Sequence, residues 1–293
     1  MAGFHFHKRK IIRFLFIIFG LLILAGISLF YLFLTPESDK EIRQFFAKNE
    51  KKAWISHVLF SGNEVRVIEM QEKPDTTKYT LLFIHGSPGS AMNFKKYLID
   101  PDLLKNFNMI AYDRIGYGAG KKVSVLNDLN KENNLVKFIA RDIPREKLVL
   151  VGYSYGGTVA AAYPENIREK ILLAPAVKAA CEPMYWVLNL YRWNFTRPLI
   201  PHMFANASME KLGHLKELPL FEDKWDLSKA SVLSIHGNKD RIVPYENSVF
   251  LLEKLGSKKF MMITLEGEGH ALVWTKFDRI KEELLKIIKK TNA

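Results

Sequence analysis

The sequence LVLVGYSYGG at residues 148–157 decides the fold that we expect for this chain. Its four leading apolar residues predict a strand that is buried on both faces, and the small residues that follow at 158–162 predict a helix. Glycines two positions before and two positions after Ser154 allow a sharp turn between the strand and the helix, because glycine lets backbone segments approach closely. This turn places Ser154 beside the first N–H groups of the helix. We therefore take Ser154 as a candidate nucleophile.

The rest of the chain also alternates short apolar runs with helical stretches. Eight strand-like runs occur, at residues 55–60, 64–71, 80–85, 109–112, 148–152, 170–173, 232–236 and 260–265. Helical patterns lie between them, at residues 91–104, 126–141, 158–163, 245–255 and 275–289. This alternation is typical of a parallel sheet with helices on both faces. We predict an α/β domain over residues 55–293 with a mostly parallel eight-stranded sheet.

One interval interrupts the alternation. No strand-like run occurs between residues 174 and 231, where several large aromatic residues gather. We predict a helical cap at about residues 176–228, inserted over the carboxyl ends of the strands, where ligands bind in open α/β sheets.

A second motif, His85-Gly86-Ser87-Pro88-Gly89, closes the strand predicted at residues 80–85. A loop at this place in the fold can supply a backbone N–H group to a negatively charged oxygen beside the nucleophile. We predict that the N–H groups of Ser87 and Tyr155 form such an oxyanion hole. His85 is expected to fix the loop by hydrogen bonding rather than to act as a base.

Two further motifs supply an acid and a base. Asp240 follows the strand predicted at residues 232–236, and His270 follows the last strand on a loop with two glycines. The carboxyl ends of parallel strands meet at one edge of a sheet, so these side chains can reach Ser154. The order Ser154, Asp240, His270 is one of the known orders of a Ser-His-Asp triad. We predict that His270 is the base and that Asp240 orients it.

The remaining candidate acids and histidines do not lie in a motif at the end of a predicted strand. Glu182 and Asp226 are the alternative acids, and His57, His202 and His214 are expected to be structural or exposed. The single cysteine, Cys181, excludes an internal disulfide and a metal site built from several cysteines. It is expected to be a small apolar filler.

The charge is strongly positive, at +12 with a pI of about 9.5. The Lys and Arg residues are spread along the chain without a basic block interleaved with aromatic residues. This pattern argues against nucleic-acid binding and favours solubility and proximity to an anionic membrane.

The amino-terminal region predicts a membrane anchor. Residues 14–34 carry no charged side chain, and as a helix they reach roughly 30 Å, the thickness of a bilayer's hydrocarbon core. Four basic residues lie within residues 1–13. The positive-inside rule therefore places residues 1–13 in the cytoplasm and the catalytic domain on the extracytoplasmic side of a single-pass protein.

A cleaved signal peptide is the main alternative to this anchor. The apolar region of a signal peptide is usually only about 7–15 residues long, and the small residues here lie inside the apolar run. After Pro36, Ser38 and Glu41 form a capping-box pattern at the start of a helix. We predict that residues 35–54 form a linker helix with Ile42, Phe45, Phe46 and Trp54 on one apolar face.

These motifs together resemble the α/β-hydrolase superfamily over roughly residues 55–290. The sequence Asp113-Arg114-Ile115-Gly116-Tyr117-Gly118 matches that superfamily's D-x-x-G-x-G turn, and the H-G-x-P-G form at residues 85–89 is most similar to its serine esterase, lipase and proline-iminopeptidase branches. Dehalogenase-like and epoxide-hydrolase-like members carry aspartate where this chain has Ser154. Gly120 departs from the pattern, because many relatives carry serine there.

The resemblance implies a cofactor-free hydrolase without a metal, but it does not name a substrate, because many functions share this fold and triad. The predicted anchor would place the site near lipid, which favours a small-molecule or lipid carboxylic ester over a peptide. Tyr185, Trp186, Trp193 and Phe195 fit a pocket for an apolar acyl group and the cap's own core equally well. An aminopeptidase stays open, because the cap offers Glu182, Glu210, Glu217, Glu222 and Asp223 to bind an ammonium group. A non-catalytic binding protein on the same fold is the third possibility.

Overall fold

The computed structural model describes residues 14–22, 26, 35–118 and 122–289, and it divides into two units, Met1–Pro36 and Glu37–Ala293. In the first unit, residues 14–22 and residue 26 are helical. The other residues of the predicted anchor, 23–25 and 27–34, and the predicted cytoplasmic residues 1–13 lie outside the described residues. Among the described residues, no helix combines the length and the apolar character that crossing a membrane requires.

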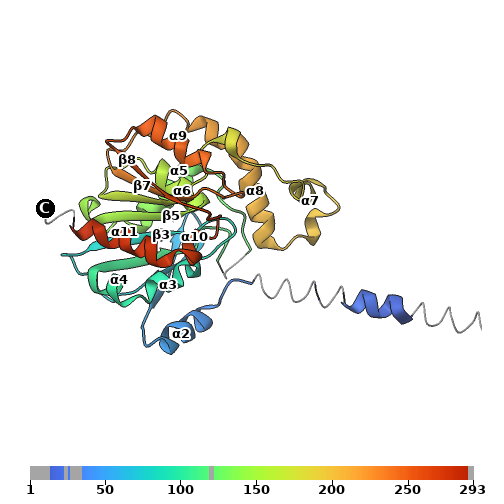
Figure 1. Ribbon diagram of the computed structural model, residues 1–293. Coiled ribbons are helices and arrows are strands. Elements are labelled where there is room, and N and C mark those ends of the chain that lie inside the picture. Colours follow the sequence, from blue (N-terminus) through green and yellow to red (C-terminus); the bar gives the residue numbers. More distant parts are fainter. Residues whose placement is uncertain (1–13, 23–25, 27–34, 119–121, 290–293) are drawn as a thin grey trace, which may run out of the picture. The chain divides into compact units, whose positions relative to one another are not determined.

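The second unit is built on one eight-stranded sheet with the order β1-β2-β4-β3-β5-β6-β7-β8 (Figure 1). The pairs β1/β2 and β2/β4 are antiparallel and all other pairs are parallel, which confirms the mostly parallel sheet. The strands are β1 (Trp54–Phe60), β2 (Asn63–Glu69), β3 (Tyr79–Ile84), β4 (Phe107–Tyr112), β5 (Leu148–Tyr153), β6 (Glu169–Leu173), β7 (Ser231–Gly237) and β8 (Phe260–Leu265).

Two apolar clusters cover the two faces of this sheet. In β3, Leu81 and Phe83 belong to one cluster and Leu82 and Ile84 to the other, because successive strand side chains point to opposite faces. The first cluster packs under α2 (Asp39–Lys48), η1 (Ala91–Phe94), α3 (Lys95–Leu98), α4 (Pro101–Asn106), α10 (Leu272–Thr275) and α11 (Phe277–Lys289). The second packs under α5 (Leu129–Ile139), α6 (Tyr155–Ala162) and α9 (Glu246–Leu255). Both clusters lie within the second unit, which therefore holds a complete core.

The start of the second unit differs from the predicted linker helix. The capping box between Ser38 and Glu41 is present, but α2 ends at Lys48 and Trp54 begins β1 instead of continuing the helix. Ile42 and Phe46 of α2 are fully buried in the first apolar cluster. This helix is thus part of the folded unit, which begins at Glu37.

A proline explains where one other helix differs from its predicted range. The stretch predicted at residues 91–104 is broken into η1, α3 and α4, because Pro101 cannot continue a helix and instead starts α4. The carboxylate of Asp100 caps this new start by accepting hydrogen bonds from the N–H groups of Asp102 and Leu103, each at 3.0 Å. The helix predicted at residues 275–289 corresponds to α11, and the short helix α10 precedes it.

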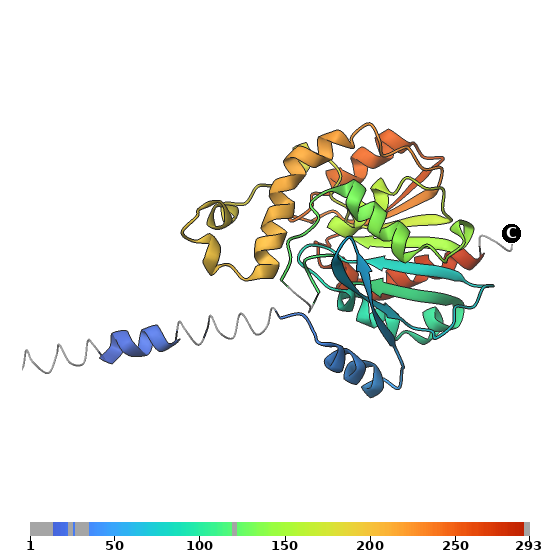
Figure 2. The ribbon, with the colours of Figure 1, turned by 180° about the vertical axis from the view of Figure 1, so that it is seen from behind.

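Helices without any strand fill the interval between β6 and β7. They are η3 (Ala179–Cys181), α7 (Leu188–Arg192), η4 (Arg197–Leu199), α8 (His202–Glu217) and η5 (Leu218–Leu220). The segment around α7 extends away from the sheet, whereas α8 runs back along the body (Figures 1 and 2). We call residues 174–230 the inserted segment.

The turn from β5 to α6 depends on close backbone contacts. A Cβ atom on Gly156 would lie 2.1 Å from the carbonyl oxygen of Ile84 on β3. We expect Gly156→Ala to destabilise the protein by about 2 kcal/mol or more, because the neighbour is backbone and cannot move aside. For a domain of this size this lowers the midpoint of thermal unfolding by roughly 5 °C. Gly269→Ala, whose Cβ has its nearest neighbour at 3.9 Å, is the control, and an equal midpoint in both variants would contradict this account.

Burial of Lys170 on β6 makes stability depend on pH. Its ammonium group donates to the carbonyl oxygens of Ala161 and Tyr163, and burial lowers its pKa to about 7. The unfolded pKa is about 10.4, so between these pH values the folded state binds fewer protons and stability rises with pH. We expect the difference in unfolding free energy between wild type and Lys170→Met to grow from pH 7 to pH 9.5 in urea titrations. For Lys229→Met, which replaces an exposed lysine, the difference in unfolding free energy from wild type should not change with pH. A difference that is also independent of pH for Lys170→Met would show that burial of Lys170 does not make stability depend on pH.

Candidate active site

Ser154 occupies the turn between β5 and α6 in a backbone conformation that side chains rarely adopt. Its φ is +55°, and its N–H donates to the carbonyl oxygen of Leu173 on the neighbouring strand at 2.8 Å. A φ in this region is unfavourable for a residue with a Cβ, so surrounding contacts must hold it. Gly152 and Gly156 permit those contacts, since a Cβ on Gly152 would lie 2.2 Å from the carbonyl oxygen of Gly156.

The structure brings the three residues predicted as a triad together. His270 Nε2 lies 3.0 Å from Ser154 Oγ, and His270 Nδ1 lies 2.7 Å from Asp240 Oδ2. An ionised Asp240 accepts hydrogen bonds only, so Nδ1 carries the proton and Nε2 is left to accept the proton of the Ser154 hydroxyl. The three side chains come from three loops at the carboxyl ends of β5, β7 and β8.

Asp240 is held as a carboxylate. Burial raises its pKa, but hydrogen bonding with His236 and His270, the charge of His270 and the N–H of Val243 outweigh this and keep the pKa well below its usual range. The N–H groups of Ile242 and Val243 both donate to Asp240 Oδ1 at 2.9 Å. The carboxylate is thereby fixed through one oxygen, while the other faces His270.

The loop after β3 lies against the serine. A Cβ on Gly86 would come 2.9 Å from Ser154 Cβ, and Ser87 lines the same cavity as Ser154 and Tyr155. Tyr155 is the first residue of α6, where no earlier turn of the helix offers a carbonyl to its N–H. The two N–H groups predicted as an oxyanion hole thus belong to segments that flank Ser154.

His85 fixes this loop, as the sequence predicted. Its ring is fully buried, with Nδ1 2.7 Å from the carbonyl oxygen of Gly86, while the N–H of Arg114 donates to Nε2 at 2.9 Å. Burial and the charge of Arg114 lower its pKa to about 3, so the ring is neutral. His85 therefore joins the loop after β3 to the loop after β4.

The other acidic, histidine and cysteine residues considered from the sequence lie away from Ser154 or contact residues other than the predicted triad. Asp226 is exposed and contacts Lys259, and His57 forms ion pairs with Asp39 and Glu64. Glu182 contacts Lys211 of α8 and Asn247 of α9 rather than His270. Half-buried Cys181 and His202 lie in the inserted segment, and neither lines the cavity at Ser154.

A cavity of about 200 Å³ opens beside Ser154, and the inserted segment forms much of its wall. Its apolar lining comes mainly from Ala176, Val187, Leu188, Phe204, Ala207, Ile242 and Val243. Its polar lining comes from Ser87, Glu182, Tyr185, Ser208, Glu210, Lys211 and His214. Polar residues recur along α8, so this helix contributes most of the polar wall.

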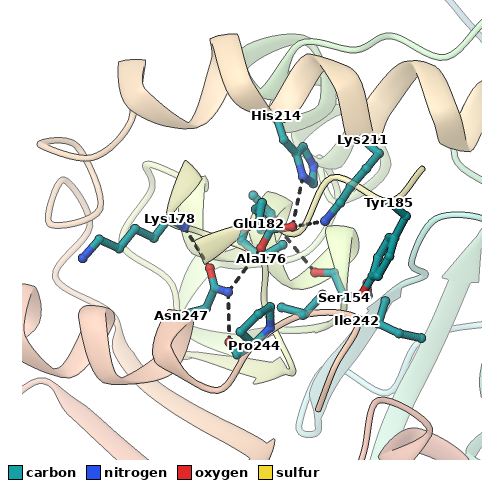
Figure 3. A network of polar contacts seen from close by, with 12 residues as sticks. Ser154, Ala176, Lys178, Glu182, Tyr185, Lys211, His214, Ile242, Pro244 and Asn247 are labelled. Carbon is teal, nitrogen blue, oxygen red and sulfur yellow. Dashed lines mark hydrogen bonds and ion pairs between the residues drawn. The ribbon is translucent and has the colours of Figure 1, made fainter. Parts of the chain in front are cut away.

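A buried polar cluster within this wall was not predicted from the sequence. The carboxylate of Glu182 contacts the ammonium of Lys211, accepts from Asn247 Nδ2 at 3.2 Å and lies 3.7 Å from His214 Nδ1 (Figure 3). Asn247 Oδ1 also accepts from the N–H groups at residues 177 and 178. Glu182 is thus held by the body of the domain and by α8 together. No local motif marks these residues, because they come from three separate parts of the chain, residues 177–182, α8 and α9.

A second buried cluster joins α8 to the body. Arg114 Nη2 donates to Glu132 Oε1 of α5 at 2.9 Å and contacts Glu210 of α8. Tyr117 OH donates to Glu210 Oε2 at 2.7 Å and lies 2.6 Å from Ser87 Oγ. The D-x-x-G-x-G turn therefore links the loop after β3 to α8, while Gly120, which departs from the pattern, lies outside the described residues.

Three of the four aromatic residues named in the inserted segment differ from both roles predicted for them. Tyr185 lines the cavity, but Trp186, Trp193 and Phe195 do not, and these three are 68%, 41% and 76% exposed. They form neither a pocket wall nor a buried core.

Within the described part of the chain, no group of three or more His, Cys, Asp and Glu side chains is arranged to hold a metal ion.

Comparisons with known proteins agree with this architecture. A family model described as the alpha/beta hydrolase fold matches residues 79–206. A putative non-heme chloroperoxidase of Synechocystis is 24% identical over 71% of this chain and 90% of its own length.

Solved structures show the same fold. A membrane phospholipase A, described as a bacterial virulence factor, has a TM-score of 0.65 at 17% identity, covering 94% of this chain and 98% of that one. A putative lipase of Acinetobacter baumannii has a TM-score of 0.63 at 20% identity, covering 88% and 98%. The eight-stranded sheet and the family match over residues 79–206 show that this chain has the α/β-hydrolase fold.

Proposed function

We propose that this protein is a serine hydrolase that cleaves an uncharged carboxylic ester through an acyl-enzyme. The observation that carries the proposal is the continuous line of hydrogen-bond distances from Ser154 Oγ through His270 to Asp240. A serine hydroxyl is a weak nucleophile until a base accepts its proton, and this arrangement supplies that base. Lipase and aryl esterase structures among the similar proteins support an ester substrate.

The residues define each step. Ser154 Oγ attacks the ester carbonyl carbon while its proton moves to His270 Nε2, and the carbonyl oxygen becomes an oxyanion that the N–H groups of Ser87 and Tyr155 stabilise. Asp240 stabilises the imidazolium. The ester C–O bond then breaks, the leaving alcohol takes the proton from His270, and the acyl group stays on Ser154. Water repeats the sequence, releasing the carboxylic acid and restoring the serine.

The cavity supports an acyl group without charge. Most of its exposed lining is apolar, and its two closest opposite charges, Glu182 and Lys211, neutralise each other. Burial raises the pKa of Glu182, but the nearby His214 ring and the charge of Lys211 outweigh this and lower it, so the carboxyl stays ionised at neutral pH. A substrate charge of either sign would have to compete with this pair.

The same pairing weighs against the aminopeptidase alternative. An ammonium-binding acid must be unpaired, yet Glu182 contacts Lys211, and Glu210 contacts Arg114. Glu217 accepts from the N–H of Leu129, and burial raises its pKa to about 7. A purely binding role fits poorly with a serine, histidine and aspartate at reacting distances.

We also propose that residues 14–34 anchor the protein in a membrane, with the hydrolase unit on the extracytoplasmic side. The support is the uncharged sequence and the basic residues before it. An anchored enzyme meets esters that partition into lipid, so a lipid ester fits the proposed activity.

The triad assignment is tested with single substitutions in the full-length protein. We expect Ser154→Ala and His270→Ala to lower kcat/KM for p-nitrophenyl butyrate by about 10⁴-fold or more, with unchanged thermal midpoints. Ser154→Ala should also lose labelling by a fluorophosphonate. Ser56→Ala and His57→Ala, on the exposed strand β1, are matched controls with normal activity. Wild-type rates in either triad variant would overturn the mechanism.

The preference of the cavity for an uncharged acyl group is tested by removing one member of the Glu182–Lys211 pair. We expect Lys211→Met to raise kcat/KM for p-nitrophenyl 4-aminobutyrate relative to p-nitrophenyl butyrate by about tenfold or more, because a buried carboxylate without its partner attracts an ammonium. Glu182→Gln should shift preference the opposite way, toward a glutarate monoester.

The double variant Glu182→Gln/Lys211→Met is the matched control for this experiment. It removes both charges together, so it should fold normally and keep the wild-type preference for the uncharged ester. If neither single variant changes the ratio of the charged to the uncharged substrate while both remain folded, the pair does not select for charge. The triad assignment would be unaffected by that result.

A further inference from the structure

Part of the inserted segment has an unusual composition. Residues 183–209 contain no Asp and no Glu, but they contain Arg192, Arg197 and a high density of aromatic residues. In the structure these residues run from the end of η3 through α7 and η4 into α8, and the part around α7 projects from the body (Figures 1 and 2).

The large apolar side chains of this part face solvent. Trp186, Val187, Trp193, Phe195 and Leu199 are between 41% and 76% exposed, and we call these five the aromatic surface. The Trp193 ring stacks on Phe195 with centroids 5.8 Å apart and meets Trp186 edge-on at 6.1 Å. Because the rings pack on one another instead of on a core, they present one continuous apolar area. Exposed apolar areas of this kind mark interaction sites.

The charges beside this surface have one sign. The guanidinium of Arg197 lies over the Tyr191 ring at 5.0 Å and donates to the carbonyl oxygens of Tyr191 and Arg192. Arg192 is exposed and approaches Asn189 Oδ1 at 3.4 Å. Among the described residues, no carboxylate forms an ion pair with either arginine. The surface therefore combines exposed aromatic rings with two cations whose charge is not neutralised.

The same part of the chain also reaches the cavity at Ser154. Tyr185, Val187, Leu188 and Phe204 line that cavity. Val187 and Leu188 lie within the stretch 186–199 that carries the aromatic surface, and Tyr185 and Phe204 lie on either side of it. Val187 belongs to both, so whatever covers the aromatic surface also adjoins the mouth of the cavity.

We propose that the aromatic surface, with Arg192 and Arg197, binds the headgroup region of an anionic lipid bilayer. Tryptophan rings favour that region, and arginines are attracted to anionic headgroups, whereas a carboxylate would be repelled. The surface needs neither turnover nor residues 14–34, so this proposal stands apart from the triad and from the anchor. Its consequence is that the cavity mouth faces the lipid from which an ester would enter.

Vesicle binding by residues 37–293 tests the proposal, since this unit holds the complete sheet and both apolar clusters. We expect sedimentation with phosphatidylcholine vesicles that contain phosphatidylglycerol, together with a blue shift of tryptophan emission. Trp186→Ser/Phe195→Ser should weaken binding at least tenfold. Arg192→Gln/Arg197→Gln should remove most of the difference between anionic and neutral vesicles. Hydrolysis of soluble p-nitrophenyl acetate should stay unchanged in both.

The matched control replaces two exposed leucines that do not belong to the aromatic surface. Leu59 and Leu227 are 70% and 62% exposed, so Leu59→Ser/Leu227→Ser removes a similar apolar exposure and should bind vesicles like the wild type. Absence of vesicle binding, or equal weakening by this control, overturns the proposal. So does a dimer in sedimentation velocity that Trp186→Ser/Phe195→Ser dissociates, because the surface would then join two copies of the chain.

Discussion

The close approach of α6 to the sheet is the constraint on which the rest of the structure depends. Ser154 adopts a φ of +55° because the helix that follows it starts directly against the backbone of β3. Only glycine fits at residue 156, where a Cβ would lie 2.1 Å from the carbonyl oxygen of Ile84. This contact fixes the direction of the serine side chain and the place of the Tyr155 N–H together. Packing of the sheet therefore positions the proposed nucleophile and one of the two proposed oxyanion donors before a substrate binds.

Much of the fold and the triad could be predicted from the sequence because both rest on local signals. Eight apolar runs became eight strands, and the carboxyl ends of parallel strands necessarily lie at one edge of the sheet. Ser154, Asp240 and His270 each follow such a strand, so their meeting needed no knowledge of side-chain packing. The errors also have local causes: Pro101 divides a predicted helix, and Trp54 pairs with Glu69 in β1/β2 rather than extending α2.

The polar wall of the cavity could not be predicted, because its partners are distant in the sequence and lack a motif. Glu182 was considered as a catalytic acid, and only the fold shows that Lys211 and Asn247 occupy its oxygens. The aromatic residues posed a similar difficulty. Composition alone cannot separate a buried core from an exposed surface, since both concentrate Trp and Phe. Trp186 and Phe195 proved exposed because the segment around α7 projects beyond the reach of the sheet's apolar clusters.

The charged residues on the two faces of the inserted segment differ in whether they have partners of opposite charge. Toward the cavity, each charge has an opposite partner: Glu182 has Lys211, and Glu210 has Arg114. A buried charge without such a partner is costly, so the inner face can carry charged residues only in pairs. Toward solvent, Arg192 and Arg197 can stay unpaired because water solvates them. Binding of an uncharged ester requires paired charges in the cavity, and binding of an anionic lipid surface requires unpaired arginines on the outside. Under the two proposals, the inner face would select an uncharged substrate within the cavity, and the outer face would set the side from which that substrate arrives.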